Sequence, residues 1–92
     1  MIACRETIVI INQRGLHARA SAKFVNMVSE LPPSCTVTVR KDGVDAAGGS
    51  ILGLMMLGAA KGDTIEIVVS GDGAEQALDQ LAALVKDGFG ED

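Results

Sequence analysis

The chain has 92 residues and a formal net charge of −4, and 48% of its residues are hydrophobic against 22% charged. This length and balance fit one folded domain over residues 1–92. The acidic charge and the absence of Trp and Tyr argue against a nucleic-acid-binding protein, which needs a basic surface and often stacking aromatics. No run of 18 apolar residues is present, so no membrane insertion is expected.

The N-terminal stretch MIACRETIVIIN does not have the features of a secretion signal. It contains no basic segment followed by an apolar core and a small-residue cleavage site. We therefore expect a cytoplasmic protein. In that reducing compartment Cys4 and Cys35 should stay free thiols and behave as small apolar residues in strands.

The first half of the chain predicts a strand, a helix and a hairpin. Residues 4–11 are β-branched and partly alternating, which indicates a strand, and a turn follows over residues 12–15. Apolar residues then recur at helical spacing from Ala18 onwards until Pro32 and Pro33 end the helix. Residues 35–41 alternate strictly, and the Asp-Gly pair at 42–43 predicts a hairpin to a strand at 44–47.

The second half predicts a short helix, a strand and a longer helix. Residues 50–57 suggest the short helix, and residues 63–70 have the composition of a strand. The final helix should open with Asp72 and Glu75 as a capping box and end near Gly88. Its apolar positions are Ala77, Leu78, Leu81, Leu84 and Val85.

This order of elements, β-α-β-β-α-β-α, predicts the fold class. A single sheet formed by four antiparallel strands, with three helices packed on one face, satisfies it. We therefore expect an α+β fold of the open-faced sandwich type.

His17, the only histidine, falls at the start of the first predicted helix. At this position the backbone amides of Ala18, Arg19 and Ala20 have no helical acceptor and the helix dipole is positive, which favours an anion. A neutral imidazole is nucleophilic near pH 7, and the guanidinium of Arg19 suits a phosphate. The geometry therefore favours a phosphorylated histidine, and the alternative is a plain capping or surface histidine.

No metal site or cofactor is expected. His17 has no cysteine or carboxylate at ligand spacing, and a structural or catalytic metal would need several such ligands. An enzyme that uses His17 as a general base is also disfavoured, because no partner acid or nucleophile accompanies it in the sequence.

The stretch GGSILGLMMLG, residues 48–58, predicts a docking surface. Ser50 is a natural N-cap, and helical spacing places Leu54 and Leu57 on one side of the short helix. The opposite side would carry four apolar residues, which we call the docking patch: Ile51, Leu52, Met55 and Met56. Methionines suit a surface that meets several partners. The alternative is that loops cover this side.

Two segments resemble the HPr family, the phosphocarriers of the phosphoenolpyruvate phosphotransferase system. GLHARASAKFV resembles that family's active-site segment, and GSILGLMMLGAAKGDTIEI resembles its second signature. The resemblance covers nearly the whole chain and implies the same element order. It implies a carrier, not an enzyme, in which Nδ1 of His17 accepts phosphate from phosphorylated enzyme I and passes it to an enzyme IIA-type protein. Arg19 would stabilise the phosphate.

The resemblance also implies regulation and leaves the branch open. Ser50 would be the regulatory serine that a serine kinase/phosphorylase modifies in some branches. The tail LVKDGFGED and the stretch LMMLGAAKG resemble nitrogen-type HPr, which feeds a regulatory relay; a sugar-uptake HPr is the alternative. Outside the family, a small ligand-binding regulatory domain with a structural His17 is the other candidate.

One residue departs from the family pattern. The family usually has a proline where this chain has Ala20, and proline suits a first helical turn because its missing N–H is not needed there. Alanine keeps the helix and adds an amide, so the exact position of the phosphate, but not its transfer, is in question. We expect a monomer, since one patch must meet several partners.

Overall fold

The computed structural model describes residues 3–91 and contains the seven predicted elements in the predicted order. They are β1 (Ala3–Val9), α1 (Ala18–Ser29), β2 (Thr36–Lys41), β3 (Val44–Ala47), α2 (Ile51–Met56), β4 (Thr64–Ser70) and α3 (Ala74–Lys86). A short 3-10 turn that was not predicted, η1 (Gly88–Gly90), follows α3.

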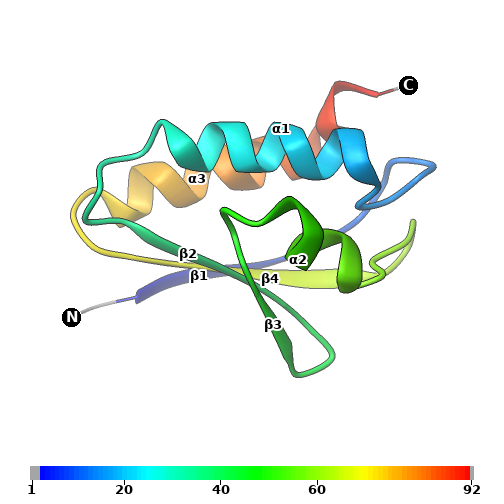
Figure 1. Ribbon diagram of the computed structural model, residues 1–92, viewed down its shortest axis with the longest axis horizontal. Coiled ribbons are helices and arrows are strands. Elements are labelled where there is room, and N and C mark those ends of the chain that lie inside the picture. The colour runs from blue at the N-terminus through cyan, green and yellow to red at the C-terminus, as the bar shows by residue number, and fades with distance from the viewer. Residues whose placement is uncertain (1–2, 92) are drawn as a thin grey trace.

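The strands form one four-stranded sheet in the order β1-β4-β2-β3, and every neighbouring pair is antiparallel. Helices α1 and α3 lie side by side over one face of it, while α2 packs against α1 and β3 (Figure 1). The predicted α+β class is confirmed. Because α1 and α3 run in opposite directions, the beginning of α1 and the end of α3 lie at the same end of the molecule.

The core lies between the sheet and the two long helices. Side chains alternate along β4, where Ile65, Ile67 and Val69 are buried and the residues between them face away. Phe24 from α1 and Leu81 from α3 close the core from above and are almost fully buried. Burying an aromatic or leucine side chain of this kind contributes about 1.5–3 kcal/mol, so this packing holds both helices against the sheet.

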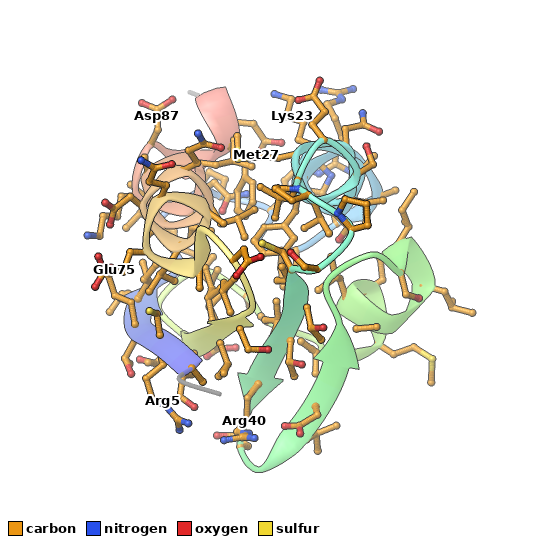
Figure 2. All side chains as sticks on the ribbon, turned by 90° about the vertical axis from the view of Figure 1, so that its left-hand side faces the viewer. Arg5, Lys23, Met27, Arg40, Glu75 and Asp87 are labelled. Atoms are coloured by element: carbon orange, nitrogen blue, oxygen red, sulfur yellow. The ribbon has the colours of Figure 1, made fainter. Side chains whose placement is uncertain are left out.

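The opposite face of the sheet carries charged side chains. Arg5 and Arg40 project from it, on the side away from Lys23 and Asp87 (Figure 2). Arg40 of β2 donates to Asp45 of β3 at 2.6 Å and to Glu66 of β4 at 3.2 Å, so these ion pairs link three strands. The Arg40 guanidinium lowers the pKa of the Asp45 carboxyl below its usual range. These pairs are satisfied among themselves and give the open face a solvated surface.

Two differences from the sequence predictions go beyond the one-residue shifts at the starts of β2 and β4. The strand predicted over residues 4–11 ends at Val9, because the Ile10 backbone bonds to Asp63 and Gly62 in the loop before β4. The capping box predicted from Asp72 and Glu75 is wrong. Gly73 occupies the N-cap of α3 with φ 75°, a left-handed conformation that glycine adopts at no steric cost. No side chain of the described residues makes a capping hydrogen bond at this end.

Of the helices in residues 3–91, none combines the length and apolar character needed to cross a bilayer. Both cysteines are free thiols that pack against the core. Cys4 lies in β1, as expected, but Cys35 lies just before β2, where its Sγ donates to the Asp72 carbonyl at 2.9 Å.

Candidate functional site

His17 occupies the N-cap of α1, as the sequence predicts. Its backbone is extended (φ −76°, ψ −177°), and its carbonyl accepts the first helical hydrogen bond from Ser21 N at 2.9 Å. Its Nδ1 accepts a longer bond from the Arg19 amide at 3.2 Å. The ring therefore turns Nδ1 towards the helix N-terminus, where the amides of residues 18–20 have no carbonyl acceptor within the helix.

The loop before His17 is pressed against the segment that follows α2. Gly15 has φ 63°, and a Cβ there would lie only 2.2 Å from the Ala59 carbonyl oxygen, so only glycine fits. The next residue, Leu16, donates its N–H to that same carbonyl at 2.9 Å. This close approach places His17 beside the end of α2, and α1 and α2 contact each other as well.

A carboxylate from the far end of the chain meets the other ring nitrogen. Glu91 Oε2 lies 2.6 Å from His17 Nε2, and the two side chains are only 16% and 14% exposed. Asn12 Nδ2 donates to Glu91 Oε1 at 3.1 Å and to the Gly15 carbonyl at 2.9 Å. The sequence predicted neither Glu91 nor Asn12 as site residues, since no spacing rule links positions so far apart.

The short turn η1 anchors Glu91. Phe89 within it is fully buried in the core, and Lys23 of α1 donates its Nζ to the Phe89 carbonyl at 2.6 Å. Gly88 lies directly after the C-cap of α3, as predicted. The C-terminal segment is thereby fixed beside the first turns of α1 (Figure 1).

Glu91 is held as a carboxylate at neutral pH. The hydrogen bond from Asn12 contributes most to lowering the pKa of Glu91, while the hydrogen bond and charge of His17 and the charge of Lys23 act in the same direction. Partial burial opposes them without reversing the effect. His17 therefore faces a negative group on its Nε2 side and positively polarised amides on its Nδ1 side.

This electrostatic arrangement gives a first prediction. An NMR titration of the Glu91 side-chain carboxyl should have its midpoint below the value of about 4.3 for an unperturbed glutamate, and Asn12→Ala should raise it. Because the folded-state pKa is lowered, the stabilisation from Glu91 is present above the unfolded pKa and is lost as pH falls through the folded value. A midpoint at or above 4.3 in the unsubstituted protein would contradict the Asn12–Glu91 contact.

The other predicted site residues lie on the first turn of α1 and at the start of α2. Arg19 is exposed on the first turn of α1, and within residues 3–91 no carboxylate lies at ion-pair distance from it. Ser50 caps α2 as predicted, since its Oγ accepts from Gly53 N at 2.9 Å. Arg19 is thus at the helix end that His17 caps, and Ser50 opens the neighbouring helix.

The two sides of α2 divide as predicted. Leu54 is fully buried and Leu57 is 8% exposed, whereas the four members of the docking patch are between 41% and 76% exposed. No loop within residues 3–91 covers them, so the alternative of a covered second side is wrong. Val44, also exposed, adjoins Met56 at a cavity of about 340 Å³ between β3 and α2 that Ser50 helps to line.

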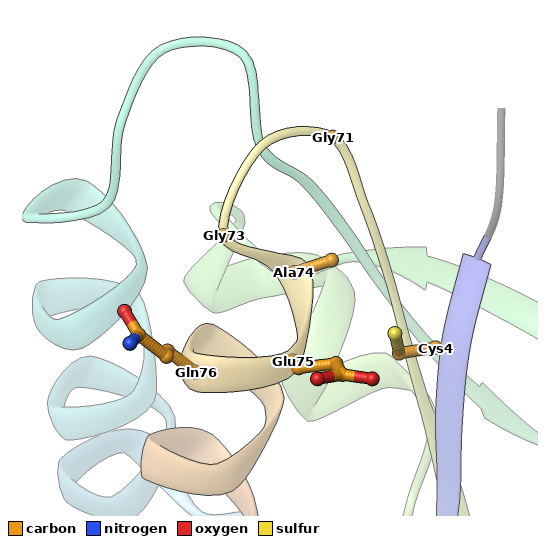
Figure 3. Close-up of a pocket in the computed structure, with 6 residues that line it drawn as sticks. All are labelled: Cys4, Gly71, Gly73, Ala74, Glu75 and Gln76. Carbon is orange, nitrogen blue, oxygen red and sulfur yellow. The ribbon is translucent and has the colours of Figure 1, made fainter.

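Two other features do not form competing sites. Residues 3–91 contain no cluster of His, Cys, Asp and Glu side chains suited to a metal ion. A shallow cavity of about 490 Å³ lies at the other end of the molecule, around the start of α3. Figure 3 shows Glu75 extending from α3 towards Cys4, whereas Gln76 points to the opposite side of the helix. The chemistry therefore concentrates at His17.

Comparisons with known proteins identify the family of the chain. The family described as "PTS HPr component phosphorylation site" matches residues 4–87. The HPr phosphocarrier of Neisseria meningitidis serogroup A is 44% identical, over 95% of this chain and 96% of its own, and the NPr phosphocarrier of Escherichia coli K12 is 36% identical, over 96% and 97%. The crystal structure of HPr from Thermoanaerobacter tengcongensis, 37% identical, superposes with a TM-score of 0.89 over 97% of this chain and 98% of that one. The chain belongs to the HPr family of the phosphoenolpyruvate phosphotransferase system, and its function is that of a phosphocarrier protein and not of an enzyme.

Proposed function

We propose that His17 carries the phosphoryl group on Nδ1, accepting it from phosphorylated enzyme I and passing it to an enzyme IIA-type protein. The observation that supports this most is that Nδ1 faces the N-terminal amides of α1 while Nε2 is engaged by Glu91. A phosphoryl group on Nδ1 would displace the long bond from Arg19 N and lie where amides of residues 18–20 can donate to it. Ala20, the departure from the family pattern, provides one of those amides.

The docking patch is proposed to bind both partners. It is apolar, exposed and joined to the His17 loop through the Gly15–Ala59 contact, so one surface can present the histidine and the patch together. Exposed apolar groups of this kind mark interaction sites. We propose a cytoplasmic monomer, because a partner must reach the patch and His17 at once.

Incubation with phosphoenolpyruvate and purified enzyme I tests this function. The protein should gain one phosphoryl group that is labile in acid, as phosphohistidine is, and lose it when an enzyme IIA-type protein is added. A small ligand-binding domain with a structural histidine would take up no phosphate. Failure to incorporate phosphate with active enzyme I from the same organism would contradict the proposal.

For the branch, we propose a regulatory relay of the nitrogen type. Its support is the resemblance of the tail LVKDGFGED and of the stretch LMMLGAAKG to nitrogen-type HPr. Sugar uptake is the second candidate, favoured by the 44% identity to a protein named HPr. Comparing transfer rates to a nitrogen-type and a sugar-type enzyme IIA separates them, and the faster acceptor identifies the branch.

Arg19 is proposed to stabilise the phosphate through its charge. Arg19→Ala should slow phosphotransfer about 10- to 100-fold, the equivalent of losing a charged hydrogen bond, with little change in melting temperature because the side chain is exposed. Arg19→Lys should recover only part of the rate, since a lysine cannot make a bidentate contact. Parent rates in both variants would remove Arg19 from the site.

The docking patch predicts a defect in binding that is separable from folding. Leu52→Asp or Met55→Asp should weaken the apparent affinity for enzyme I about 10-fold or more, because each would bury an unpaired charge against the partner. Val9→Asp, a matched change at a half-exposed residue on β1, should leave the affinity unchanged. Equal weakening in all three, or a large fall in melting temperature for both patch variants, would contradict the assignment.

A further inference from the structure

The contact between Glu91 and His17 fixes more than the position of the ring. A neutral imidazole has one N–H, and the nitrogen that carries it is set by the partner of that nitrogen. Glu91 is ionised and can only accept, so the proton of His17 must lie on Nε2 for the 2.6 Å contact to be a hydrogen bond. Nδ1, which accepts from Arg19 N, then has a free electron pair.

Asn12 is arranged to keep Glu91 in this role. It is 3% exposed, and its Nδ2 donates to Glu91 Oε1 and to the Gly15 carbonyl. Its Oδ1 has no hydrogen-bond partner within residues 3–91. A buried amide oxygen without a partner is costly. The orientation of Asn12 is therefore set by its two donated bonds, one to the carboxylate and one to the loop that carries His17.

We infer that Glu91 is a positioning residue for phosphotransfer, which holds the proton of His17 on Nε2 and leaves Nδ1 as the nucleophile. This inference rests on the proposed phosphorylation of His17. It also assigns a use to the C-terminal turn, because Phe89 and Lys23 hold Glu91 at the ring. In other nucleophilic sites, too, a carboxylate hydrogen-bonded to a histidine fixes the tautomer and orientation of its ring.

The transfer step balances with these groups alone. The Nδ1 electron pair forms the new N–P bond as the phosphoryl group leaves its donor, and the donor keeps the electron pair of the bond that breaks. The ring keeps its proton on Nε2 and becomes positively charged. Glu91 stabilises that charge, and the ring returns to the neutral state when the phosphoryl group moves on to the acceptor.

The direct test is the tautomer of His17, read by long-range ¹H–¹⁵N NMR at about pH 8, where an unperturbed histidine is neutral. The unsubstituted protein should show the proton on Nε2 only. Glu91→Ala should shift the ring towards a mixture of the two tautomers, whereas Glu75→Ala, which removes the same charge at the far end of α3, should not. A proton that stays on Nε2 in Glu91→Ala, or a shift of equal size in Glu75→Ala, would overturn the inference.

The second readout is the rate of phosphorylation by enzyme I at saturating concentration. Glu91→Ala should be slower by about 10-fold, and Glu75→Ala should match the unsubstituted protein. A shifted tautomer with an unchanged rate would overturn the role in transfer. If the unsubstituted protein is phosphorylated and Glu91→Ala matches it in both readouts, only the role of Glu91 fails; if the unsubstituted protein takes no phosphoryl group, the proposed function fails with it.

Discussion

His17→Ala is expected to abolish phosphate uptake from enzyme I and to leave the fold intact. The side chain is the proposed acceptor, and no other imidazole is present in the chain. Removing the side chain removes one helix cap, which lowers the free energy of unfolding by about 0.5–2 kcal/mol. A typical domain has a free energy of unfolding of about 5–15 kcal/mol. Phosphate incorporation and a thermal melt, measured side by side, check both parts.

His17→Asn is the matched control for the cap. Asparagine is among the best N-cap residues, so this variant should melt close to the unsubstituted protein and still take up no phosphate. Uptake at the parent rate by either variant would show that another residue is phosphorylated. Loss of folding in His17→Asn would instead show that the ring is needed for the structure.

Ser50→Asp is expected to weaken docking of enzyme I without changing the site at His17. Aspartate can cap α2 in place of the serine hydroxyl that now accepts from Gly53 N, so the helix should persist. The added charge lies at the edge of the docking patch, where the partner must exclude water, and an unpaired charge there is costly. A phosphate on Ser50 carries about −1.5 to −2 charges, and its effect should be larger in the same direction.

The rate of phosphorylation measured over a range of enzyme I concentrations separates these effects. Ser50→Asp should need about 10-fold more enzyme I for half-maximal rate, at a near-normal maximal rate. Ser50→Ala, which loses the cap but adds no charge, should keep the parent affinity and melt somewhat lower. An unchanged affinity or an unfolded Ser50→Asp protein would contradict the docking account.

The features that the sequence predicts correctly are those determined by residues close together in the chain. The cap at His17 and the division of α2 into Leu54 and the docking patch both follow from helical spacing, which is a local property. The four strands follow from alternation and from the Asp-Gly turn in the same way. These local signals agree with one another, which is why the order of the elements was predictable.

The features that the sequence missed depend on contacts between distant residues. Glu91 meets His17 only because α3 runs back over the sheet and Phe89 is buried at its end. The sequence predicts Asn12 only as a turn residue. Its hydrogen bond to Glu91 joins residues far apart in the chain and leaves no local sequence pattern. The wrong capping box has a local cause. Gly73 adopts the left-handed conformation and becomes the N-cap, so α3 begins at Ala74, one residue later than a cap at Asp72 would place it.

The central claim is that Nδ1 of His17 holds the phosphoryl group at the N-terminus of α1. The measurement that tests it most directly is an NMR spectrum of the phosphorylated protein with ¹⁵N-labelled histidine, in which phosphorus couples to the nitrogen that carries it. The predicted result is coupling to Nδ1, with the proton remaining on Nε2 beside Glu91. Coupling to Nε2, or a phosphorus signal with no coupling to His17, would contradict the account.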